Sequence, residues 1–410
     1  MTVKRCALRN ELEFLADKPI MRVCRTLFAA LLLLLPIPLH YAQQTDEGRP
    51  KLKDFGSSVK RLKWDSNAKH AVEKERPRKS DQPIEDEVIR VTTDLVTSDV
   101  QVTDAKGNIV TGLTQDDFIV FEDGWVQTIH HFSLGNDQNV PRTIVLVIDH
   151  SGSQAPYIEK SVEAAKTLVD QLGPRDLMAI VTDDVKLLVD FTRDKEKLKK
   201  KLDSLRKTRG DSKQFTALLA TVREVFTVED ARRIVIFQTD GDELFHLRPS
   251  VPPLFSIPDT GVPFESVVLR SFSLRDLYLA IEKSRVSVYT VIPSPPFIES
   301  QFHTGLKTTE ELFGDPKQRY FPDVAYRRWE QIAAAGAAIG GWTAYLPTPE
   351  HAADIYRRIL ADINTRYVIG YYPTNKTRDG KRRRVSITIK GHPEHGVWGR
   401  KSYIASDENN

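Results

Sequence analysis

The chain has 410 residues, enough for two or three domains, and its 40% hydrophobic residues are sufficient for a packed core. The formal net charge of +3 falls to zero once residues 1–42 are left out, because the remainder holds 53 basic and 53 acidic residues. That balance argues against nucleic acid as the main partner.

Residues 1–42 are predicted to be a secretory signal peptide, with Met21 as an alternative true start. Arg22 and Arg25 precede a continuous apolar run at 27–35. This run is shorter than the ~20 residues that span a membrane, so we expect no transmembrane segment in the mature chain. A short N-terminal membrane anchor is the alternative interpretation.

Both cysteines, Cys6 and Cys24, lie within the predicted signal peptide. The mature protein then has no disulfide, although secretion would place it in an oxidising compartment. We expect a secreted or periplasmic protein of the cell envelope.

Residues 43–86 are rich in charged and polar residues and are predicted to be a disordered linker. From 87 to 138 the sequence alternates apolar and polar residues between turns, which predicts a small antiparallel β module. A similar pattern returns over 363–405. We expect this C-terminal β segment to pack with the N-terminal module.

Between these segments, residues 141–362 alternate buried strands with helices. This rhythm predicts a doubly wound, mainly parallel α/β sheet of Rossmann-like type, to which the flanking segments add an accessory antiparallel β module. Two long stretches within it, 243–270 and 293–322, are rich in Pro, Phe and Ser. The first could shape the rim of a site beside Asp240.

Five oxygen-bearing side chains follow the predicted strands or open a helix. Asp149 ends the strand at 143–149 and is followed by Ser151 and Ser153, Asp240 ends a second strand, and Thr216 opens the helix between them. Ligands in such sheets bind beyond the carboxyl ends of the strands, so we expect these side chains to converge. Hard oxygen donors favour Mg²⁺ or Mn²⁺ over zinc or copper. The alternative is that the two aspartates only end strands and cap turns.

The same five residues resemble the metal-ion-dependent adhesion site (MIDAS) of von Willebrand factor type A (VWFA) domains. That family has D-x-S-x-S, a distant Thr and a later Asp, often in a "TDG" context, which stands here at 239–241. The segment "RGDSKQF" before Thr216 departs from the usual Gly-Gly-Thr. The wider chain resembles the VWFA-related proteins of Acidobacteria, through the β module at 102–124 and the Y-x-x-G-Y segment at 367–371.

The resemblance implies a metal held by Asp149, Ser151, Ser153, Thr216 and Asp240, with one coordination position left for an Asp or Glu of a protein partner. The predicted function is therefore metal-dependent protein binding or adhesion by a protein that is not an enzyme. Two alternatives remain: a Mg²⁺-dependent hydrolase or phosphatase on a similar sheet, and an envelope scaffold with an inactive metal site.

Two further features are interpreted as ordinary surface. Asp183 and Asp184 follow a strand and are expected to form a solvated turn. His392 and His395 flank Pro393 in a predicted turn, and two histidines without further ligands are a weak metal signal.

Overall fold

The computed structural model describes residues 52, 54–74, 95–137, 140–207, 212–226, 232–248, 269–293 and 340–407. The predicted signal peptide and most of the two long stretches at 243–270 and 293–322 therefore lie outside the described residues. None of the helices in the described ranges is long and apolar enough to cross a membrane.

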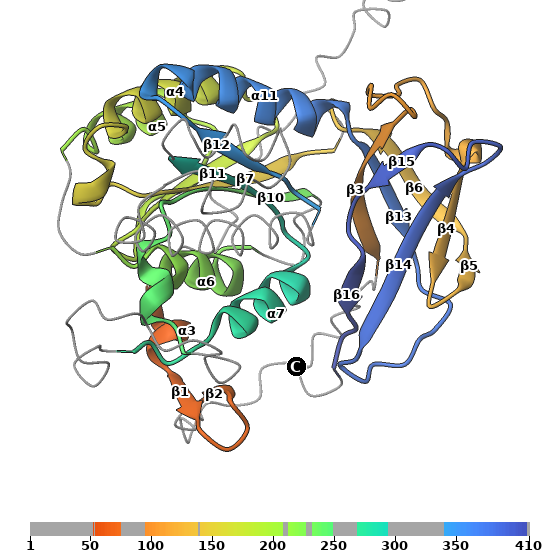
Figure 1. The fold of residues 1–410 in the computed structure, drawn as a ribbon, viewed down its shortest axis with the longest axis horizontal. Coiled ribbons are helices and arrows are strands. Elements are labelled where there is room, and N and C mark those ends of the chain that lie inside the picture. Colours follow the sequence, from red (N-terminus) through yellow and green to blue (C-terminus); the bar gives the residue numbers. More distant parts are fainter. Residues whose placement is uncertain are drawn as a thin grey trace, which may run out of the picture. The chain divides into compact units, whose positions relative to one another are not determined.

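A six-stranded sheet forms the centre of the α/β part, in the order β12-β11-β10-β7-β8-β9 (Figure 1). Every pairing is parallel except that of β9 with β8. This confirms the predicted α/β class with a mainly parallel sheet. The strands are β7 (Arg142–Ile148), β8 (Leu177–Thr182), β9 (Lys186–Thr192), β10 (Arg232–Gln238), β11 (Ser287–Pro293) and β12 (Thr343–Leu346).

Helices cover both faces of this sheet (Figure 1). On one face, apolar side chains of α4, α5 and α11 pack on the strands around Ile144 and Tyr289. On the other face, α6 and α7 pack around Val145 and Phe237. Both faces are thus buried, which explains why β7 is apolar without alternation. The helices are α4 (Ile158–Asp170), α5 (Lys195–Asp203), α6 (Gln214–Glu224), α7 (Leu274–Ser284) and α11 (Ala352–Thr365).

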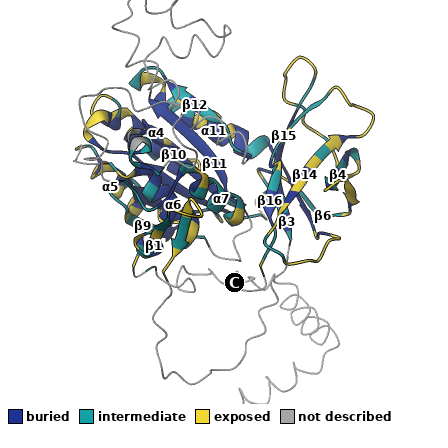
Figure 2. Ribbon diagram, turned by 60° about the horizontal axis from the view of Figure 1, so that its bottom comes forward, coloured by how far each residue is buried: buried dark blue, intermediate teal, exposed yellow. Residues whose placement is uncertain are grey.

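The flanking segments form two four-stranded sheets, in the orders β15-β3-β13-β6 and β16-β14-β4-β5. Each sheet mixes strands from before and after the α/β part. Buried residues alternate mainly with exposed ones along β14, as Figure 2 shows on the ribbon, whereas β13 is buried throughout. The strands are β3 (Val96–Thr103), β4 (Phe118–Glu122), β5 (Trp125–Gln127), β6 (Ile129–Leu134), β13 (Tyr367–Tyr371), β14 (Arg382–Ile389), β15 (Gly396–Trp398) and β16 (Ser402–Ile404).

The predicted disordered linker over 43–86 is wrong for residues 54–74. These form a short helix, α3 (Ser57–Lys60), and a hairpin of β1 (Leu62–Asp65) and β2 (His70–Glu73). Glu224 of α6 accepts hydrogen bonds from the backbone N–H groups of Gly56 and Ser58, each at 2.7 Å. Phe55, Val59 and Leu62 pack into the core beneath α6 and α7. This segment has few apolar residues, but their spacing places them on the side that packs against the core.

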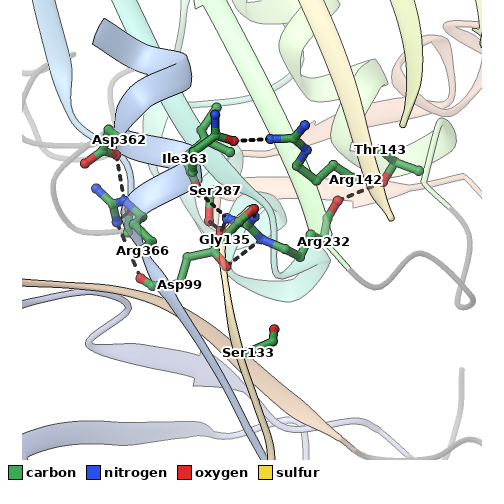
Figure 3. Close-up of polar contacts among 12 residues, drawn as sticks. Asp99, Ser133, Gly135, Arg142, Thr143, Arg232, Ser287, Asp362, Ile363 and Arg366 are labelled. Carbon is green, nitrogen blue, oxygen red and sulfur yellow. Dashed lines mark hydrogen bonds and ion pairs between the residues drawn. The ribbon is translucent and has the colours of Figure 1, made fainter. Parts of the chain in front are cut away.

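Buried arginines connect the α/β part to the antiparallel β sheets (Figure 3). Arg232, at the start of β10, contacts both carboxylate oxygens of Asp99 in β3 at 3.1 Å. The same guanidinium donates to the carbonyl oxygens of Gly135 at 2.8 Å and Ile363 at 3.2 Å. Those two carbonyls lie where the chain leaves the β sheets and where it returns. The Arg232 side chain therefore binds both segments that join the α/β part to the β sheets.

A second ion pair lies beside the first (Figure 3). Arg366 donates to Asp362 at 2.6 Å and to the backbone carbonyl of Asp99 at 3.4 Å. Asp362 also accepts a hydrogen bond from Tyr289 of β11 at 2.9 Å. Because these charges are buried, removal of one partner leaves the other uncompensated, which costs far more than loss of a surface pair.

Asp99→Ala is expected to lower the free energy of unfolding by about 3–5 kcal/mol at pH 7, because it leaves the buried Arg232 charge without its carboxylate. Burial alone would raise the pKa of Asp99, but the nearby Arg232, Arg366 and Arg400 outweigh it and lower the pKa below 3.8. The carboxylate therefore stabilises the fold above the pKa of the unfolded state, and this stabilisation is lost as the pH falls through the lower folded value. Denaturant unfolding should be measured between pH 7 and pH 3. The difference in free energy of unfolding between wild type and Asp99→Ala should decrease below about pH 4.

The matched control is Asp116→Ala, an exposed carboxylate of the same β part, for which we expect a change within about 0.5 kcal/mol. An Asp99→Ala penalty no larger than the control, or one that does not vary with pH, would contradict the role of this ion pair.

Candidate metal centre

The carboxyl ends of β7 and β10 form a switch point in the sheet. On one side of β7 the sheet continues with β8 and β9, and on the other side it continues with β10, β11 and β12. The last residues of the two strands, Ile148 and Gln238, are paired directly. Asp149 follows one strand and Thr239-Asp240 follows the other. Switch points of this kind form the ligand crevice of open α/β sheets.

Four of the five predicted ligands are joined by hydrogen bonds at this point. The Asp149 carboxylate accepts from the backbone N–H of Ser151 at 2.9 Å. The hydroxyl oxygens of Ser151 and Ser153 lie 3.0 Å apart, and Ser153 donates to Asp240. Asp149 is fully buried, Asp240 is 8% exposed, and Ser153 is exposed. The cluster therefore faces solvent on the side of Ser153.

Two glutamine amides donate to the carboxylates, and one of them bridges the pair. Gln214, the first residue of α6, donates from Nε2 to Asp149 Oδ2 at 2.8 Å and to Asp240 Oδ1 at 3.0 Å. Its carbonyl oxygen accepts from the backbone N–H of Glu243 at 3.2 Å. Gln154 donates to Asp240 Oδ2 at 3.0 Å. The amide hydrogens thus supply positive partial charge between two carboxylates that would otherwise repel one another.

The fifth predicted ligand, Thr216, is bonded to a different carboxylate. Its backbone N–H donates to Glu243 at 2.9 Å, and its hydroxyl donates to the other oxygen of Glu243. Arg270 completes the contacts of Glu243 at 2.6 Å. Thr216 lies two residues beyond Gln214 on α6, so it borders the cluster, but its hydrogen bonds go to Glu243 rather than to the other four residues.

The cluster carries more negative charge than its donors offset. Burial raises the pKa of Asp149 to about 7, the charges of Asp240 and Asp183 add to the rise, and hydrogen bonds from Gln214 and Ser151 oppose it. Close, buried carboxylates that cannot all ionise are stabilised when a cation joins them. This electrostatic state is suited to a divalent ion.

His150 and Asp183 form a neighbouring pair that the sequence did not predict. Asp183 is 1% exposed and contacts Nδ1 of His150, while its Oδ1 also accepts from the His150 backbone N–H at 3.1 Å. The expected solvated turn is therefore wrong for Asp183. The hydrogen bond with Asp183 raises the pKa of His150, and burial opposes the rise.

The donor chemistry fits a hard divalent cation. Asp149, Ser151, Ser153 and Asp240 offer only carboxylate and hydroxyl oxygens. The side-chain oxygen Oε1 of Gln154, whose amide nitrogen donates to Asp240, is buried and has no hydrogen-bond partner among the described residues. A buried acceptor without a donor is uncommon and is satisfied when a cation lies nearby.

The sequence did not point to Gln154, Gln214 or Glu243. Gln214 precedes Thr216 by two residues at the helix start, so its position was visible. Its role depends on two carboxylates from separate strands, which only the folded sheet brings together.

Residues 144–243 match the family model described as von Willebrand factor type A domain. The match covers less than half of the chain, and no curated protein matches the sequence. The resemblance to the acidobacterial proteins stays a prediction.

Several solved structures are similar at low identity. An aerotolerance-related membrane protein from Bacteroides fragilis has 15% identity and a TM-score of 0.32, over 55% of this chain and 98% of that chain. The vWF domain of the type V pili tip protein Mfa5 from Porphyromonas gingivalis has 15% identity and a TM-score of 0.34, over 55% and 95%. Manganese-loaded Plasmodium vivax TRAP protein has 13% identity and a TM-score of 0.30, over 70% and 98%.

Gln214→Ala should destabilise the metal-free protein by about 1–3 kcal/mol, because it removes a buried donor from Asp149 and from Asp240 at once. Urea unfolding in EDTA measures this. Lys213→Ala, at the exposed preceding position, is the control and should change the free energy by less than about 0.5 kcal/mol. Equal effects of the two substitutions would mean that the amide bridge contributes nothing to stability.

Proposed function

We propose that this chain, whose residues 144–243 match a von Willebrand factor type A domain, is a metal-dependent protein-binding module of the cell envelope. The main support is the hydrogen-bonded convergence of two buried carboxylates and two serine hydroxyls at the switch point of the sheet. Asp149, Ser151, Ser153 and Asp240 would hold Mg²⁺ or Mn²⁺. When bound, the ion supplies an open coordination position that an Asp or Glu of a partner can fill.

The chain's own residues would prepare this position. Backbone and amide donors fix the two aspartates, so that few side chains must reorganise when a cation arrives. Exposure of Ser153 leaves the cluster open to a partner on one side. A charge interaction at such a partly buried rim is stronger than the same interaction in bulk water.

The Thr216 hydroxyl donates its hydrogen to Glu243, which leaves the lone pairs of the same oxygen available to a cation, but it has no hydrogen bond to the other four residues. Its contribution is therefore separable from that of the other four residues. We propose Thr216 as the conditional ligand, and its substitution distinguishes a site that recruits α6 from one completed by the Asp149 loop and Asp240 alone.

Hydrolase chemistry is less well supported by the same geometry. His150 is engaged with Asp183, and in the part of the chain that the structure describes no hydrogen bond joins His150 to Ser151 or Ser153. A histidine activates a serine only within hydrogen-bond reach. Ser151 also stands where an aspartyl phosphatase would carry its second acid. A non-enzymatic role is therefore the proposal.

A location outside the cytoplasm is part of the proposal. It rests on the predicted signal peptide over 1–42 and on the absence of cysteine from 43–410. The charge balance of that remainder favours a protein partner over nucleic acid.

Excess Mg²⁺ should raise the thermal midpoint of wild-type protein above its value in EDTA, because a ligand at a hundredfold excess over its dissociation constant adds about 2.7 kcal/mol to the folded state. Asp149→Ala should melt identically in both buffers. Asp170→Ala, which removes an exposed carboxylate from the end of α4, should retain the full shift.

Thr216→Ala in the same experiment separates the two ligand sets. A reduced Mg²⁺ shift supports recruitment of Thr216, whereas a full shift leaves the ion to the other four residues. A shift of equal size in wild type and Asp149→Ala would place the metal elsewhere and overturn the site.

Ser153→Ala and Asp240→Ala should abolish capture of a partner from envelope extract of the source cells, with the far-UV spectrum unchanged. Capture by wild type should fail in EDTA and should also fail from extract whose carboxyl groups have been amidated, because the partner's acid would then be lost. Undiminished capture under either condition would show that binding uses another surface.

A further inference from the structure

The turn between β14 and β15 brings together three side chains that can bind metal. His392, Glu394 and His395 offer ligand atoms that all lie within 4.8 Å of one another. Glu394 Oε1 lies 3.0 Å from His392 Nδ1 and 3.2 Å from His395 Nδ1. Two atoms bound to one zinc ion at about 2.0–2.2 Å lie roughly 3.3 Å apart in a tetrahedron. The carboxylate is therefore already at ligand spacing from both imidazoles.

The backbone holds this turn in a compact form. Gly391 adopts a left-handed conformation with φ of 73°, and the N–H groups of His392 and His395 donate to Ile389 and His392 at 3.3 and 3.1 Å. The Lys390 N–H donates to the carbonyl of Asp117 at 2.8 Å, which ties the turn to the start of β4. The three side chains thus belong to a turn whose backbone is fixed, which lowers the entropy cost of binding an ion.

The turn also lies against β3. Gly396 pairs with Thr103, and a Cβ at Gly396 would come within 2.6 Å of the Thr103 hydroxyl. A larger residue at this position would force the Thr103 side chain to move. Trp398, two residues further, donates to the same hydroxyl at 3.3 Å and is 59% exposed. An indole therefore sits next to the turn.

One imidazole nitrogen lacks a normal partner. His395 Nδ1 is buried from solvent and, among the described residues, has no hydrogen bond of acceptable geometry, although Glu394 lies nearby. His395 interacts electrostatically with Asp104, and His392 with Asp117, so the surroundings add negative charge. A nitrogen left without a donor or acceptor in an acidic setting is suited to a cation.

We infer that His392, Glu394 and His395 form a second metal site, selective for a borderline divalent ion such as Zn²⁺. Two imidazoles and one carboxylate are the ligand types that zinc, copper and nickel prefer, whereas Mg²⁺ prefers oxygen alone. The site therefore differs in chemistry from the cluster around Asp149. Three protein ligands leave a fourth position for water on the exposed side.

Equilibrium dialysis against Zn²⁺ tests this inference on protein made without a histidine tag and with Cys6→Ser and Cys24→Ser, so that no thiolate competes. One Zn²⁺ per chain should bind to this background, and none to the same chain carrying His392→Gln and His395→Gln. Each single substitution should weaken binding more than the roughly 10- to 100-fold caused by loss of a residue that only orients a ligand. Asp149→Ala should bind Zn²⁺ unchanged.

Cu²⁺ quenching of tryptophan fluorescence locates the ion. Saturable quenching should appear in the protein with His392 and His395 intact, and should disappear in the double variant and in Trp398→Phe. Equal thermal midpoints of the metal-free proteins show that the double variant is folded. Absence of Zn²⁺ binding, or equal binding by the double variant, would overturn the site irrespective of any result with Mg²⁺.

Discussion

The pairing of β7 with β10 is the constraint on which the rest of this structure depends. The two strands run parallel and in register for seven residues each, from the Arg142–Arg232 pair to the Ile148–Gln238 pair. Parallel pairing places like ends together. Both arginines therefore lie at one edge of the sheet, and both aspartates that follow the strands lie at the opposite edge. A shift of register by one residue would separate each pair.

The arginines at the amino ends of the strands need negative charge nearby, and the aspartates at the carboxyl ends need positive charge. The chain meets these two needs in different ways. At the amino end, Asp99 and Asp176 contribute full negative charges to Arg232 and Arg142, which fixes the sheet to its surroundings. At the carboxyl end, the compensation comes from the neutral amides of Gln154 and Gln214. Amides reduce repulsion without removing net charge. Arg232 and Arg142 at the first end thus face carboxylates, whereas Asp149 and Asp240 at the second end face neutral donors.

The sequence was sufficient where local pattern determines structure. Apolar runs predicted the buried strands, and the positions of Asp149 and Asp240 followed from where those runs end. It was insufficient where partners come from distant elements. Gln214 and Glu243 are ordinary polar residues until the sheet assembles, and Asp183 looks solvated until His150 packs on it. Residues 54–74 were misjudged because Glu224, 166 residues from Ser58, supplies their anchor.

The insertion of the α/β part between β6 and β13 sets the order in which the protein can fold. Within the described sheets, β3 has neighbours only in β13 and β15, which are synthesised more than 260 residues later. Closing so long a loop by chance is entropically costly and slow. The folded α/β part shortens this loop, because Arg232 donates hydrogen bonds to both Gly135 and Ile363 and so holds the two ends of the loop close together. In a nascent chain β4 can pair with β5 at once, whereas β3 and β6 have no sheet neighbour until the residues after the α/β part have been made.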